Sequence, residues 1–178
     1  MQQKIKTALI SVSDKTDIPM VLKVLKKYNI KIISSGGTYK YIKKLGYVCT
    51  EISSYTGFKE MLDGRVKTLH PKIHAGILHD RTNKKHSKEM VKQKFLSIDL
   101  IIVNFYPFQK IVTSSSNDKE IIENIDIGGP TMVRAAAKNF KNVLIITNKN
   151  DYFDLVNEIE GVGSTSRIRG IAAGGARC

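Results

Sequence analysis

Three short apolar runs constrain the fold of this 178-residue chain more than any other feature. They are TALIS at 7–11, LIIVNF at 100–105 and VLIIT at 143–147. Continuous apolar runs of this length are typical of strands that are buried on both faces. Two further strands are expected at 30–34 and 47–52. The pattern therefore predicts an α/β fold in which a parallel sheet carries helices on both faces.

Segments with helical spacing separate these strands. After Asp17, an expected helix cap, the residues Met20, Val21, Val24 and Leu25 mark one apolar helical face. Further helices are expected at 39–45, 83–95, 130–140 and 151–159. Ligands of parallel sheets bind beyond the carboxyl ends of the strands, so the residues that follow each strand are the candidates for a site.

Length and composition fit one soluble domain. No apolar stretch approaches the ~18 to 20 residues that a membrane span needs, and the N-terminal apolar run is too short for a signal peptide. A cytoplasmic protein is therefore expected. Cys49 and Cys178 have no zinc-type spacing, and Cys49 is interpreted as a buried free thiol. We expect no disulfide.

The formal net charge of +13 favours an anionic partner. The lysines are spread along the chain without an RNA-binding aromatic motif or a zinc finger, so nucleic-acid binding is not expected as the main function. A small phosphorylated substrate also suits a locally basic site. Residues 161–178 are rich in glycine, serine and arginine and show no amphipathic period, which is typical of a linker or an added sequence. The folded domain is therefore expected to span 1–160.

Two turns at strand ends have the residues of a phosphate site. Ser11–Thr16 and Ser34–Thr38 offer hydroxyls and backbone N–H groups at the start of a helix, where an anion binds well. Turn and capping chemistry alone would use the same residues. Neither segment matches GxxxxGK[ST] or GxGxxG, which argues against ATP or NAD as the ligand.

A cluster of donors lies within 63–78. Arg65, Lys67, Thr68 and His70 stand close together in sequence and suit a negative charge that is present or develops in a reaction. A solvated basic loop is the alternative interpretation.

His70 and His74 are four residues apart, as zinc ligands on a helix would be. Pro71 is expected to disfavour a helix through that span, and no glutamate of an HExxH motif lies between them. We therefore predict no metal site.

Two more segments place polar residues at the end of a strand or at the start of a helix, where a ligand is expected. Asn104 ends the LIIV strand, and 124–131 leads into a helix that carries Arg134 and Lys138 on one face. Asp126 and its neighbouring glycines resemble a second ligand-facing turn. An ordinary charged helix face is the alternative.

In this order, SVSDKT, SSGGT, RVKTLHP, VNFYPF and ENIDIGGPTMVRAAAKN resemble the IMP cyclohydrolase domain of the bifunctional AICAR transformylase/IMP cyclohydrolase family. The resemblance runs from about Thr7 to Tyr152. It implies a methylglyoxal-synthase-like fold and the dehydrative closure of 5-formamido-imidazole-4-carboxamide ribotide (FAICAR) to IMP, without a metal or cofactor. The family commonly has glycine where Asp17 stands, which we interpret as a change of helix cap. The transformylase half is not in this chain.

Carried over residue by residue, the resemblance implies a catalytic group of Lys67, Tyr106, Asp126 and Lys138. Lys67 would stabilise the developing oxyanion, while Asp126 and Tyr106, oriented by Lys138, would take the amide proton. The implied substrate-binding residues are Ser11, Ser13, Lys15, Ser35, Gly37, Thr38, Arg65, Thr68, Asn104 and Gly128.

The resemblance also implies the partners of the chain. They are FAICAR and IMP, a second copy in a homodimer, and a transformylase domain in the full-length protein, with no nucleic acid and no membrane. Three alternatives stay open: an allosteric module like the regulatory domain of carbamoyl-phosphate synthetase, a methylglyoxal synthase, and a basic nucleic-acid-binding protein.

Overall fold

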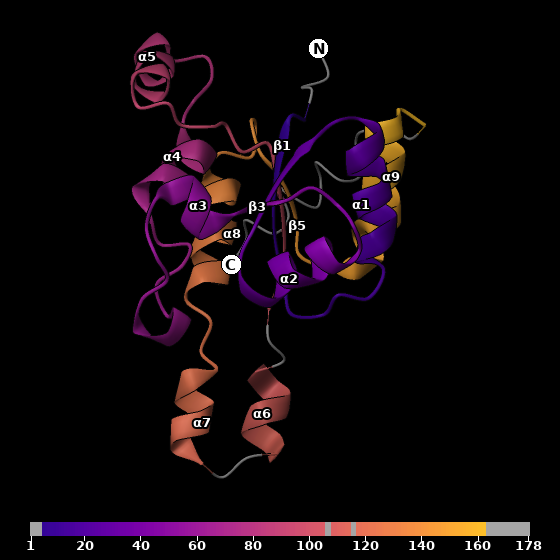
Figure 1. Ribbon diagram of the computed structural model, residues 1–178, viewed down its shortest axis with the longest axis vertical. Helices are drawn as coiled ribbons and strands as arrows, with labels where there is room; N and C mark the ends of the chain where they lie inside the picture. The colour runs from indigo at the N-terminus through magenta and orange to yellow at the C-terminus, as the bar shows by residue number, and fades with distance from the viewer. Residues whose placement is uncertain (1–4, 106–107, 115–116, 163–178) are drawn as a thin grey trace.

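The computed structural model describes residues 5–105, 108–114 and 117–162 (Figure 1). Its strands form one parallel sheet in the order β3-β2-β1-β4-β5, which confirms the predicted sheet. The strands are β1 (Thr7–Val12), β2 (Lys31–Ser34), β3 (Thr50–Glu51), β4 (Leu100–Asn104) and β5 (Leu144–Ile146). The expected strand at 47–52 is shorter at both ends: residues 47–49 have no regular secondary structure, and Ile52 already begins a helix.

Strand β1 lies at the centre and sets the register of the sheet. Ile10 pairs with Ser34 of β2, and Val12 pairs with Asn104 of β4. The carboxyl ends of these three strands therefore meet at one edge. The turns that follow β1 and β2 are brought to that edge by the pairing alone.

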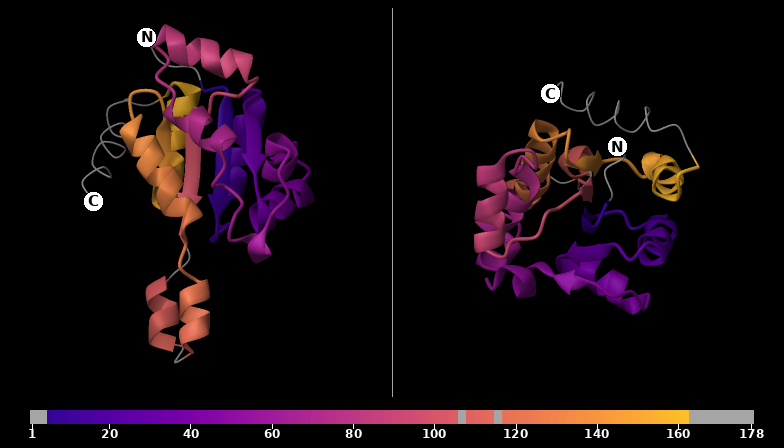
Figure 2. Two further views of the ribbon diagram at one scale, coloured as in Figure 1. Left: turned by 90° about the vertical axis from the view of Figure 1, so that its left-hand side faces the viewer. Right: turned by 90° about the horizontal axis from the view of Figure 1, so that it is seen from above.

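Helices cover both faces of the sheet (Figures 1 and 2). One face carries α1 (Ile18–Lys27), α2 (Gly36–Lys44) and α9 (Tyr152–Glu160), and the other carries α3 (Ile52–Thr56), α4 (Pro71–Leu78) and α8 (Gly128–Lys138). Successive residues of β1 supply the two cores: Ala8 and Ile10 are buried under the first group, and Leu9 under the second. This alternation is the two-residue period of a strand that is covered on both sides.

The remaining helices lie outside these layers. They are α5 (Lys84–Lys92), α6 (Phe108–Ser114), α7 (Asp118–Glu123) and the short η1 (Leu62–Gly64) and η2 (Lys149–Asp151). Helices α6 and α7 project together from one end of the body (Figure 1). Thr113 and Ser114 complete α6. None of the helices in the described ranges is long and apolar enough to cross a membrane.

Two expectations about helix starts are wrong. Pro71 does not prevent a helix at 70–74: it begins α4, where a missing N–H costs nothing, and His70 Nδ1 accepts the N–H of Lys72 at 3.1 Å. Asp17 precedes α1 but makes no side-chain cap. Its backbone instead adopts a left-handed conformation with φ 63°, which glycine adopts at least cost.

This conformation predicts the effect of substitution at Asp17. An L-residue in the left-handed region costs roughly 1–2 kcal/mol, so Asp17→Gly is expected to stabilise the fold by about 1 kcal/mol. For a chain of this size the thermal midpoint should rise by about 2–4 °C. Asp17→Ala is the matched control, since it removes the same charge and keeps a Cβ. A midpoint that rises equally in both variants would show that the charge, not the backbone, is responsible.

The buried carboxylate of Asp99 connects the start of β1 to Arg81, which follows α4. Asp99 is 6% exposed and accepts the backbone N–H groups of Lys6 at 2.7 Å and Thr7 at 2.8 Å. Its other oxygen lies 2.9 Å from an Arg81 guanidinium nitrogen. Burial lowers the pKa of Arg81, and Asp99 opposes that shift.

Asp99→Ala is expected to destabilise the fold by about 3–5 kcal/mol, because it removes the buried carboxylate that pairs with the half-buried Arg81 and accepts the Thr7 N–H. Urea unfolding measures the loss. Glu160→Ala, which breaks an exposed ion pair with Lys27, should change the free energy of unfolding far less. If both variants lost the same free energy of unfolding, the burial of Asp99 would not explain the effect of its substitution.

Candidate functional site

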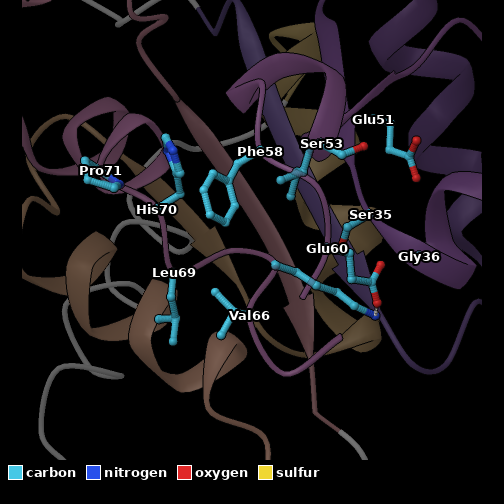
Figure 3. Close-up of a pocket in the computed structure, with 12 residues that line it drawn as sticks. Ser35, Gly36, Glu51, Ser53, Phe58, Glu60, Val66, Leu69, His70 and Pro71 are labelled. Carbon is cyan, nitrogen blue, oxygen red and sulfur yellow. Dashed lines mark ion pairs between the residues drawn. The ribbon is translucent and has the colours of Figure 1, made fainter. Parts of the chain in front are cut away.

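A cavity of about 340 Å³ opens beyond the carboxyl end of β2 (Figure 3). Its wall combines the turn after β2, the start of α3 and the loop that leads to α4. The lining residues are Ser35, Gly36, Glu51, Ile52, Ser53, Phe58, Glu60, Val66, Lys67, Leu69, His70 and Pro71. Side chains from three separate segments therefore meet where a ligand of a parallel sheet is expected.

Lys67 brings a positive charge into this cavity. Its side chain is 33% exposed, and its Nζ lies 2.7 Å from Glu60 Oε1. A Cβ built on Gly36 would lie 3.5 Å from the same Nζ, so the lysine reaches over the backbone of the turn after β2. Gly36 has φ 53°, a conformation that a side chain would strain. Lys67 and the turn with Ser35, both implied by the resemblance, thus share one cavity.

Lys15 lies next to the same turn. Its Nζ donates to the carbonyl of Ser13 at 3.1 Å, and a Cβ on Gly37 would lie 4.0 Å from that Nζ. The two segments predicted to hold a phosphate are therefore adjacent in space. Ser11 is half-buried on β1 opposite Val103.

Asn104 fixes the turn after β1. Its Oδ1 accepts from the Ser13 N–H at 2.6 Å, the Ser13 hydroxyl at 2.9 Å and the Asp14 N–H at 3.1 Å. Its Nδ2 donates to the Asp14 carbonyl at 2.9 Å. Ser13 and Asn104, both predicted to bind substrate, are thus hydrogen-bonded to each other in this structure.

Thr38 of α2 also fixes the end of β1 by hydrogen bonds. Its hydroxyl accepts from the N–H of Val12 at 3.1 Å and donates to the Val12 carbonyl at 2.9 Å, and the residue is 4% exposed. It therefore locks α2 to the end of β1. Direct ligand binding by Thr38 stays a prediction.

The carboxylate of Asp14, unlike its backbone, is not bonded to Asn104 and instead contacts η2. Hydrogen bonds from Thr16 and Lys149 lower the pKa of its carboxyl group. The Lys149 ammonium lies 2.9 Å from Asp14 Oδ2, and the pair joins the turn after β1 to the segment after β5.

A second group forms at the start of α8. Asp126 Oδ1 accepts the N–H of Gly129 at 2.8 Å, and the Thr68 hydroxyl occupies the place where a Cβ on Gly128 would be. Lys67 therefore faces the cavity, while the next residue, Thr68, contacts α8. The structure brings Thr68, Gly128 and Asp126 together, although none of the three lines the cavity.

Two predicted residues, Lys138 and Arg65, lie elsewhere. Lys138 is exposed in the last turn of α8, ~15 Å along the helix axis from Gly128, so this chain does not bring it to Asp126. Arg65 is exposed and forms an ion pair with Glu123 of α7. Tyr106 lies outside the described residues. The catalytic roles of Lys138 and Tyr106 stay predictions.

Sequence reasoning missed part of the cavity wall. Glu60 and Phe58 follow no strand, and the Phe58 ring packs at a tilt against His70, with 5.9 Å between centroids. Because His70 Nδ1 accepts the N–H of Lys72, the neutral imidazole carries its proton on Nε2. Gly57 and Gly64 both have positive φ. These two glycines were the sequence feature from which a tightly turned loop around Phe58 and Glu60 could have been predicted.

Neither metal binding nor thiol chemistry is suggested by the described residues. They contain no group of three His, Cys, Asp or Glu side chains able to hold a metal ion. Burial lowers the pKa of His74. Cys49 is free but only half-buried rather than buried, and burial raises its pKa to about 12. Cys178 lies outside the described residues.

Comparison with known proteins places this geometry in a family. The sequence profile described as MGS-like domain matches residues 17–131. The bifunctional purine biosynthesis protein PurH of Clostridium perfringens strain SM101 is 53% identical over 155 residues, which are 87% of this chain and 31% of that protein. PurH of Clostridium acetobutylicum is 49% identical over 162 residues, which are 91% of this chain and 32% of that protein.

A solved structure agrees. The crystal structure of ForH superposes with a TM-score of 0.82 at 28% identity and covers 97% of this chain and 90% of the ForH chain. The present chain spans about a third of the length of the PurH proteins it matches. The match confirms the predicted methylglyoxal-synthase-like fold, and the chain belongs to the MGS-like domain family, with bifunctional PurH proteins among its relatives.

Proposed function

We propose that this chain catalyses the dehydrative closure of FAICAR to IMP, as a cyclic amidine-forming hydrolase of purine biosynthesis. One observation carries the proposal: the Lys67 ammonium lies in a cavity that the turn with Ser35 and Gly36 also lines, close to the backbone of that turn. A nucleotide can thus place its phosphate on the turns and its reacting groups beside Lys67. The PurH relatives are named as bifunctional purine biosynthesis proteins, which supports a role in purine biosynthesis.

The reaction has two chemical requirements. The carboxamide nitrogen must lose a proton as it attacks the formyl carbon, and the formyl oxygen gains negative charge before water leaves. Lys67 would stabilise that charge and assist the departure of water. Asp126 and Tyr106, with Lys138, would handle the amide proton. No redox agent enters this chemistry.

The phosphate would lie between the turns after β1 and β2. Lys15 is adjacent to Gly37, and Ser35 is the residue immediately before α2. The N–H groups at the start of a helix and a nearby ammonium both favour an anion. We further propose that the full-length protein carries a transformylase domain, acts as a homodimer in the cytoplasm, and needs neither nucleic acid nor a membrane.

The direct test mixes the purified chain with FAICAR and follows IMP by mass, since closure removes one water. IMP formation supports the proposal. Binding of IMP without turnover would indicate an allosteric module instead. Consumption of dihydroxyacetone phosphate would indicate a methylglyoxal synthase, and salt-sensitive duplex binding a nucleic-acid-binding protein.

Lys67→Ala is expected to lower kcat by ~10²- to 10³-fold, the usual loss for one oxyanion donor. The formyl oxygen is nearly neutral in the substrate and becomes anionic only as the ring closes, so kcat should fall more than KM rises. Steady-state closure measures both, with circular dichroism to confirm folding. An unchanged kcat in a folded variant would remove Lys67 from the catalytic group.

Lys15→Ala is expected to weaken IMP binding much more than inosine binding, because the lysine would contact the phosphate that inosine lacks. Calorimetric titration with both ligands gives the comparison. Lys149→Ala serves as a control, since this lysine already pairs with Asp14. Equal losses for IMP and inosine in the Lys15 variant would place the phosphate elsewhere.

A further inference from the structure

Glu60 is the carboxylate that meets Lys67 inside the cavity. The two side chains lie 2.7 Å apart and are 45% and 33% exposed, respectively (Figure 3). The resemblance assigned no role to Glu60. Its position beside the proposed oxyanion donor raises the question of what the ion pair does.

The backbone of the loop is built so that these two residues oppose each other. Met61 and Val66 form an antiparallel bridge, with backbone bonds of 3.5 Å and 3.4 Å, and η1 closes the turn between them. Glu60 and Lys67 flank this bridge, which is the position of a cross-strand pair. The pair is therefore a product of the loop's register and not a chance contact of two long side chains.

Gly64 leaves room for the pair. It has φ 94°, and a Cβ there would lie 2.6 Å from Lys67 Nζ. The lysine stem thus folds back over the turn toward Gly36. Without a partner, its four-carbon chain would sample many rotamers in an open cavity.

We propose that Glu60 is a positioning residue that holds the Lys67 ammonium at the turn after β2, ready to stabilise the developing oxyanion. This inference rests on the proposed function. An ammonium has three N–H donors, so one can point to Glu60 while the others remain for the ligand. Holding the cation in place before the reaction lowers the cost of organising it at the transition state.

A different role would have a different signature. If Glu60 merely occupied Lys67 until a ligand displaced it, removing the carboxylate would improve binding and leave kcat unchanged. A positioning role predicts the reverse, since the loss should appear in the chemical step.

The test compares Glu60→Gln, Glu60→Asp, Lys67→Ala and the double variant Glu60→Gln/Lys67→Ala in FAICAR closure. Glu60→Gln should lower kcat about tenfold with KM changed less than about twofold, and Glu60→Asp should recover part of the loss. In the Lys67→Ala background the same change should have no further effect, because Glu60 acts through the lysine. Glu160→Gln, which breaks a 2.6 Å ion pair with Lys27 away from the cavity, is the matched control and should behave as wild type.

An unchanged kcat for Glu60→Gln, or an equal loss with and without Lys67, would overturn the inference. So would a lower KM with an unchanged kcat. Thermal midpoints near that of wild type would exclude a general loss of structure.

A second measurement is independent of turnover. The ¹³Cε resonance of Lys67, identified by its loss in Lys67→Ala, should be distinct in the wild-type chain and should move to the value of the other exposed lysines in Glu60→Gln. If wild type makes no IMP, the proposed function fails, yet this spectrum still decides whether Glu60 holds Lys67. An unmoved resonance would overturn the positioning role.

Discussion

The pairing of β1 with both β2 and β4 is the constraint on which the rest of the molecule depends. It aligns the ends of three buried strands, so that the turns after β1 and β2 become neighbours. Asn104 then fixes the first turn through Ser13 and Asp14, and Thr38 fixes the second element through Val12. A slip of one residue would exchange the two cores under β1 and separate these contacts.

The cation of the site comes from a loop rather than from the sheet. The bridge between Met61 and Val66 directs Lys67 into the cavity, while Thr68 packs against Gly128 and so connects the loop to α8. The loop therefore has contacts on both sides, one with the turn after β2 and one with the helix that follows Asp126. In the proposed function, the edge of the sheet would hold the phosphate while this loop and α8 would supply the reacting groups.

The parts that sequence predicted best were those with strong local patterns. Buried strands such as β4 and the helices α1 and α9 follow from apolar periodicity, which needs no knowledge of distant contacts. The parts it missed depend on long-range geometry. The strand expected at 47–52 is only Thr50–Glu51, and α4 begins at a proline that was expected to stop it.

The site shows the same contrast. Lys15, Ser35 and Lys67 were named from motifs and lie around neighbouring turns, whereas Glu60 was invisible because only the bridge places it opposite Lys67. Lys138 is the reverse case: it belongs to a strong motif, yet the length of α8 separates it from Asp126. Position along a helix is fixed by rise per residue, so a motif that spans a whole helix joins residues that are distant in space.

The most direct test of this account is a crystal structure of the chain with IMP bound. The account predicts the phosphate between the turns after β1 and β2, near Lys15 and Ser35, and the newly closed edge of the purine within hydrogen-bond distance of Lys67 Nζ. A nucleotide bound with the closed edge of its purine away from Lys67, or with its base outside the cavity, would contradict it.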